Sequence, residues 1–154
     1  MILRNKKVSY VCIKCCVCSS AETIQHLFFD RYFAHFVWNT VHITYEIQLT
    51  TSFANMFGSW LHGLTLKLRN QIFMWAAALC WSIWLNRNNM VFNKAKPNTS
   101  MQVIFRTMYW IRQWSMLHNK EERPLFFEGC KRWEMLIIHE SYWSIVFCVV
   151  PCAQ

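Results

Sequence analysis

The sequence contains almost no aspartate. Asp30 is the only one among 154 residues, and the other acidic residues are seven glutamates spread along the chain. Polymerases, nucleases and other two-metal enzymes need clustered carboxylates to hold their ions. A Tyr-x-Asp-Asp motif also cannot be built with a single aspartate. The sequence therefore argues against an enzyme of this kind.

Glycine and proline are also scarce, with three of each. Turn-rich β architectures use these residues frequently, so their scarcity favours helices. We see no internal repeat and no low-complexity tract. The sequence therefore predicts a mainly α protein.

Long apolar runs are missing as well. The longest, Ile72 to Leu85, falls about five residues short of the ~20 that span a membrane. The apolar stretch Val8 to Ile13 is too short for the core of a secretory signal. We therefore expect no transmembrane segment and an intracellular location, either nuclear or cytoplasmic. In a reducing compartment, the four cysteines between positions 12 and 18 suggest metal binding before disulfides.

Aromatic residues and positive charge are plentiful. The chain is 55% hydrophobic and 17% aromatic, and its formal net charge is +8. This much apolar material fills a dense core, faces a protein partner or forms an exposed patch. The positive charge permits binding to single-stranded or duplex nucleic acid. A solvated basic surface is an equally good explanation.

Apolar periodicity predicts three main helical segments. The first begins near Ser20 and continues to about Val41. The longest covers Lys67 to Val91, and another long helix covers Ser100 to His118, with Thr99 or Ser100 as its cap. Because the connection around Pro97 is short, these last two should pack as an antiparallel hairpin.

The domain organisation follows from these segments. We expect a cysteine-containing turn with a helix at 1–45, a linker at 46–66, the helical hairpin at 67–119 and a C-terminal extension at 120–154. A short helix, Glu128 to Ile138, is expected in the extension. The apolar pattern of residues 141–154 is compatible with a strand and predicts no definite fold.

Two cysteines have the spacing of a metal knuckle. Cys15 and Cys18 are separated by two residues, so both thiolates can turn toward one ion, and His26 follows on the first helix. The alternative is buried free thiols with a surface histidine, since free cysteine often behaves as a small apolar residue.

These residues carry a family resemblance. Cys15-Cys16-Val17-Cys18, then Glu22-Thr23, His26-Leu27-Phe28-Phe29 and Trp38, resemble the zinc-binding region that follows the reverse transcriptase in plant LINE-type retrotransposons. That family reads approximately C-x-x-C, then E-T-x-x-H-L-F-x-x-C and a Trp. Further on, the stretch Trp81 to Phe92 resembles the family's W-x-I-W-x-x-R-N-x-x-x-F.

The resemblance implies a structural Zn²⁺ held by Cys15, Cys18 and His26, and association with nucleic acid. The position of the family's last cysteine ligand is Arg31 here, which removes one bond to the metal and adds repulsion. Cys12, Cys16, His35 or water would then have to complete the site. The residues expected to meet phosphate are Arg69, Arg87, Lys94 and Lys96. The family's polymerase lies upstream of this region, so no reverse transcription by this chain is implied.

Three hypotheses of different classes remain. The chain is a binding domain, or a non-catalytic, partner-dependent retroelement remnant whose exposed aromatics once packed on a neighbouring domain. The third hypothesis is association with a membrane surface through the apolar tail. For Trp75, Trp81, Trp84, Trp110 and Trp114, helical spacing favours a core over base stacking. Cys80 and Cys130 are conceivable nucleophiles, but neither lies in a nucleophile motif.

Overall fold

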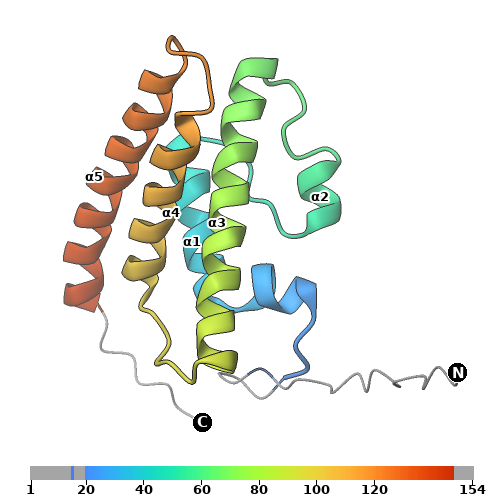
Figure 1. Cartoon of the computed structure of the whole chain (residues 1–154), viewed down its shortest axis with the longest axis vertical. Helices are drawn as coiled ribbons and strands as arrows, with labels where there is room; N and C mark the ends of the chain where they lie inside the picture. Colours follow the sequence, from blue (N-terminus) through green and yellow to red (C-terminus); the bar gives the residue numbers. More distant parts are fainter. Residues whose placement is uncertain (1–14, 16–19, 148–154) are drawn as a thin grey trace, which may run out of the picture.

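The computed structural model describes Cys15 and residues 20–147, without the side chains of residues 140–147, and this part of the chain is mainly α-helical (Figure 1). No strand forms within it. Its helices, in chain order, are η1 (His26–Asp30), α1 (Tyr32–Tyr45), α2 (Phe53–Phe57), α3 (Leu66–Phe92), α4 (Ser100–Ser115) and α5 (Arg123–Phe147).

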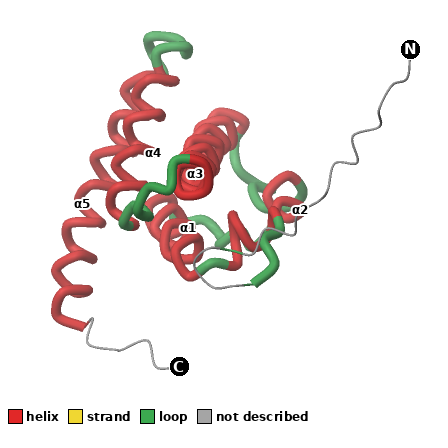
Figure 2. Tube along the Cα trace, turned by 60° about the horizontal axis from the view of Figure 1, so that its bottom comes forward, coloured by secondary structure: helices red, strands yellow, loops and turns green. Residues whose placement is uncertain are grey.

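Helix α3 is the central element. Its neighbours are α4, which lies alongside it in the opposite direction, and the η1 turn near its C-terminal end (Figure 1). Figure 2 shows α3 between the α4 and α5 layer and the α2 segment. A helix with partners on several sides must be apolar on more than one face, and α3 buries both Trp75 and Ala78. This explains its long apolar run without a membrane.

Side-chain caps fix both long helices at their beginnings. Thr65 precedes α3 and accepts a hydrogen bond from the backbone N–H of Leu68. Thr99 precedes α4 and forms a capping box with Gln102, in which each side chain binds the other's backbone N–H. Such caps satisfy the N–H groups that have no partner inside the helix. The two caps therefore fix where α3 and α4 begin.

The first helical segment differs from the prediction. We expected one helix from near Ser20 to about Val41, but the backbone of Arg31 is extended, with φ −66° and ψ 139°, and divides the segment into η1 and α1. Thr23 Oγ1 accepts from the His26 N–H before the break. The physical reason lies in the Arg31 side chain, which turns back to Glu22.

Helix α5 is also longer than predicted. The expected helix, Glu128 to Ile138, is the middle of a helix that runs from Arg123 to Phe147. Pro124 does not prevent its start, because the first turn of a helix does not need that N–H. Residues 141–147, whose pattern was compatible with a strand, continue the helix.

The core brings the first and last helices together. Helix α5 packs on α1 and α4. Trp75 of α3 contacts Trp133 of α5 at 4.9 Å between ring centroids and Tyr45 of α1 at 5.4 Å. Gly129 lies where these rings meet, since a Cβ there would come within 2.8 Å of the Trp75 ring. Close packing of this kind permits no larger side chain at that position.

None of the helices within the described residues is both long enough and apolar enough to cross a lipid bilayer.

Candidate functional site

Glu22 joins two distant parts of the chain. Its Oε2 lies 2.6 Å from Nη2 of Arg31, and its Oε1 lies 2.7 Å from Nε of Arg87 on α3. The side chains are largely buried, with 7% of Glu22, 12% of Arg31 and 14% of Arg87 exposed. Ionised groups so shielded from water need partners of opposite charge. The pair of contacts therefore ties the segment before η1 to the C-terminal half of α3.

The same contacts change the roles that the sequence predicted for the two arginines. Arg87, expected to meet phosphate, is occupied by Glu22 and lies 5.8 Å from the Phe92 ring centroid. Arg31, at the position expected for the last metal ligand, binds the other oxygen of Glu22. Neither guanidinium is a free cation on the surface.

The predicted zinc ligands are only partly described. The Cys15 side chain is buried at 2% exposure, and its backbone N–H donates to the carbonyl of Ser20. His26 is half-buried at the start of η1. Cys18, like Cys12 and Cys16, lies outside the described residues. Among the residues that are described, no three His, Cys, Asp or Glu side chains come together as a metal would require. The described set therefore does not by itself fit a four-ligand zinc site.

The expected phosphate-binding residues do not form one patch. Arg69 is half-buried in the first turn of α3. Lys94 and Lys96 are exposed beyond the other end of that helix, more than roughly 30 Å away at 1.5 Å per residue. Of the four, only these two lysines lie close together and extend into solvent.

A cavity of about 490 Å³ is lined in part by Pro97 and Asn98, which directly follow these lysines in the chain. It opens between the Arg31 break and the turn from α3 to α4. The residues that line it are Ser20, His26, Asp30, Arg31, Tyr32, Phe33, Asn86, Met90, Pro97 and Asn98. Its volume is in the range of small-molecule sites, and its lining combines apolar side chains with a few polar groups, as such sites do.

Hydrogen bonds hold one wall of this cavity. Asn86 Oδ1 accepts from the backbone N–H of Asn98 at 3.0 Å. With the Asn98 amide turned to satisfy both groups, its oxygen accepts from Nη1 and Nη2 of Arg106 at 3.2 Å. These bonds fix the turn between α3 and α4 and place the Arg106 cation beside the cavity.

The tryptophans divide between core and surface. Trp75 is 1% exposed and Trp110 and Trp114 are half-buried, but Trp81 and Trp84 are 39% and 40% exposed. These two rings stack with centroids 5.0 Å apart. They border a shallow groove whose lining is Phe28, Ala77, Cys80, Trp81, Trp84 and Trp114.

The thiols of Cys80 and Cys130 are poor nucleophiles. Burial raises the pKa of Cys80 to about 12 and, as the largest of several effects, that of Cys130 to about 11. The reactive form of cysteine is the thiolate. Both residues are therefore protonated near neutral pH.

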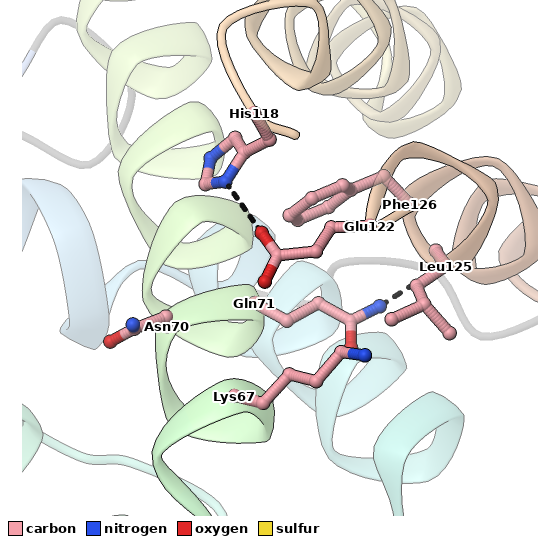
Figure 3. Close-up of a pocket in the computed structure, with 7 residues that line it drawn as sticks. All are labelled: Lys67, Asn70, Gln71, His118, Glu122, Leu125 and Phe126. Atoms are coloured by element: carbon pink, nitrogen blue, oxygen red, sulfur yellow. Dashed lines mark hydrogen bonds and ion pairs between the residues drawn. The ribbon is translucent and has the colours of Figure 1, made fainter. Parts of the chain in front are cut away.

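A smaller hollow lies at the opposite end of α3 (Figure 3). His118 Nδ1 lies 3.4 Å from Glu122 Oε2, and Gln71 donates to the carbonyl of Leu125 at 3.0 Å. Figure 3 shows Lys67 and Gln71 of α3 facing the α4–α5 turn and the start of α5, with the Gln71 hydrogen bond between them. With a volume of about 40 Å³ the hollow has room for a few water molecules only. Its contacts serve to connect helices.

The chain matches no protein-family model, no curated protein and no solved structure.

Sequence reasoning missed most of this geometry. Glu22 and Asn86 were noted only as members of the two stretches that carry the resemblance. Tyr32 and Asn98 drew no attention at all. One signal was present: Glu22 is the only glutamate in the two stretches that carry the resemblance, and Arg31 and Arg87 are the only arginines in them.

Proposed function

We propose that this chain is a non-catalytic domain of the reverse transcriptase zinc-binding type that associates with nucleic acid. The observation that supports the proposal is the double contact of Glu22 with Arg31 and Arg87. It joins the stretch that begins at Glu22 to the stretch that begins at Trp81. The two segments that carry the resemblance thus belong to one structural unit.

The nucleic-acid surface in this proposal centres on Lys94 and Lys96. Both are exposed. The segment 84–106, which covers the end of α3, the connecting turn and the start of α4, contains no acidic residue. Polyanions bind such a surface by releasing counterions, so the affinity depends on salt. Arg69 and Arg87 have smaller roles, because one lies far away and the other is paired with Glu22.

Salt titration tests this proposal. Binding of the full chain to a labelled single strand is measured by fluorescence anisotropy at several salt concentrations. The slope of log affinity against log salt should fall by about 0.7 for each phosphate contact that is lost. We expect the Lys94→Glu, Lys96→Glu double variant to lower both affinity and slope, while Lys120→Glu, between α4 and α5, serves as the matched control. Salt-independent binding, or none, contradicts the proposal.

Zinc is a separate part of the proposal. Cys15, Cys18 and His26 would hold a structural ion that orders the turn before η1. Metal content per chain is measured for the natural full-length protein and for Arg31→Cys after purification under reducing, metal-controlled conditions. About one zinc per natural chain supports a metal held with a substitute ligand. Zinc in Arg31→Cys alone indicates that this sequence has lost the site, and zinc in neither contradicts the resemblance.

One observation favours the alternative of a partner-dependent remnant. The stacked Trp81 and Trp84 leave about two fifths of each side chain exposed beside an apolar groove, a feature that often marks a lost or missing partner. This alternative predicts self-association that is insensitive to salt and relieved by Trp81→Gln with Trp84→Gln. Sedimentation of both proteins distinguishes it from phosphate binding.

A further inference from the structure

The cavity between the Arg31 break and the α3–α4 turn lies in a positively charged corner of the molecule. Segments 20–33 and 84–106, which supply its lining, contain five cations and only two carboxylates, Glu22 and Asp30. Glu22 is occupied by two of the five, Arg31 and Arg87. Of the other three, Lys94 and Lys96 lie in the turn, and Arg106 lies on α4, where it contacts Asn98. These three cations would attract the phosphates of a nucleic-acid strand that lies along this side of the cavity.

An aromatic side chain lies at the rim of the same cavity. Tyr32 begins α1, lines the cavity and is 88% exposed. Phe33 and Met90 contribute apolar surface to the lining. An exposed ring beside cations is the arrangement that proteins use to stack the bases of single-stranded nucleic acid.

The cavity also offers polar groups for the edge of a base. Asp30 contributes a carboxylate, and the Asn86 and Asn98 amides line the space as well. Asp30 Oδ1 is held by Gln25 Nε2 at 2.9 Å, and Gln25 in turn donates to the carbonyl of Thr51. These hydrogen bonds position the carboxylate before any ligand arrives. A purely apolar groove would lack this selectivity for a polar heterocycle.

We propose that this cavity binds an unstacked nucleobase of a single strand, with Tyr32 stacking on the base and Lys94, Lys96 and Arg106 contacting the neighbouring phosphates. The inference rests on the proposed association with nucleic acid and deepens it by naming the strand type and the pocket. Duplex DNA, whose bases are stacked and paired, should bind more weakly than a single strand. The helix break at Arg31 contributes to this site, because it places Tyr32 at the start of α1, where the side chain lines the cavity.

The test compares a labelled single-stranded DNA with an abasic strand of the same length, which carries the same phosphates but no bases. We expect the full chain to bind the normal strand about tenfold more tightly, because stacking of one base on an aromatic ring has roughly that effect. Tyr32→Ala should remove this difference and leave the salt dependence unchanged. Tyr32→Phe should retain it. Tyr109→Ala on α4, 53% exposed and outside the cavity, is the matched control.

Three other outcomes overturn the inference in distinguishable ways. Equal binding of normal and abasic strands, with normal salt dependence, removes the base pocket but leaves the proposed function standing. A tenfold difference that persists in Tyr32→Ala places base recognition elsewhere. Absence of binding to either strand contradicts both proposals. Circular dichroism of Tyr32→Ala and Tyr109→Ala confirms that the comparison is between folded proteins.

Discussion

The carboxylate of Glu22 accepts a hydrogen bond from Nε of Arg87 at 2.7 Å, although 65 residues separate them in the chain. Its other oxygen accepts from Arg31. One acidic side chain thus closes the N-terminal turn onto α3. This contact both positions the Arg31 break and withdraws Arg87 from solvent.

Replacing Glu22 should therefore be costly. In Glu22→Gln two largely buried guanidinium groups lose their counter-charge, and breaking a buried pair in this way costs about 3 kcal/mol. Glu134→Gln is the matched control, because its ion pair with Arg112 is more exposed, with side chains 34% and 40% accessible, and should change stability by less than about 1 kcal/mol. Urea unfolding of both variants measures the difference. Equal losses of unfolding free energy in the two variants would show that the Glu22 ion pairs stabilise the fold no more than the exposed pair does.

Gly129→Ala should destabilise the protein. Alanine is favoured over glycine inside a helix by about 1 kcal/mol, but its Cβ would lie 2.7 Å from Tyr45 Oη and 2.8 Å from Trp75 Cζ2. Overpacking of this kind costs about 1–3 kcal/mol, so the net effect should be a loss measured by thermal unfolding. Tyr45→Phe in the same chain should restore part of it, because it removes the nearer atom.

Stability should decrease in alkaline solution. Burial raises the pKa of the Cys130 thiol from its ordinary 9.0 to about 11 and that of Cys80 to about 12, and it raises the pKa of Tyr45 as well. Above pH 9 the unfolded thiols lose protons that the folded ones keep, so the unfolded state gains stability. Between pH 9 and 11 each thiol should lower the free energy of unfolding by about 1.4 kcal/mol per pH unit.

Denaturant unfolding at a series of pH values checks this expectation. Cys130→Ala should show a smaller slope above pH 9 than the natural chain, whatever its stability at neutral pH. An identical slope in the two proteins would mean that Cys130 ionises equally in both states.

Trp38→Phe should cost about 1 kcal/mol. The Trp38 indole donates to the carbonyl of Phe28 at 2.8 Å, and this hydrogen bond lies at the junction of η1 and α1. Phenylalanine keeps the apolar contact with Phe29 but leaves that carbonyl without its donor. Trp84→Phe, at a partly exposed position, should change stability by less than about 0.5 kcal/mol. Guanidinium unfolding compares the two substitutions.

The mainly α fold class was predictable from the sequence because apolar spacing and capping residues act locally. The prediction of a long helix at Lys67 to Val91 differs from α3 by one residue at each end. The helix break at Arg31, by contrast, was not predictable from local sequence. Its extended backbone depends on Glu22 and, through Glu22, on Arg87 of a distant helix, and no local pattern encodes such a contact.

Candidate site residues were harder to predict for the same reason. Lys94 and Lys96 were named because charge is visible in a sequence. Tyr32 and Asn98 line one cavity only after η1 and the α3–α4 turn come together. The length of α5 was underestimated at both ends. Pro124 lies in its first turn, where a proline is tolerated, and the apolar pattern of residues 141–147 is compatible with a strand as well as with a helix.

The packing of α5 on α1 has a consequence for how the chain is made. Synthesis proceeds from the N-terminus, so α1 emerges from the ribosome long before α5, which packs on it in the folded chain. During that interval the nascent chain exposes an apolar face of α1 that is buried in the folded protein. The contacts between α1 and α5 form only after α5 has emerged, and chaperones have access to this face of α1 until then.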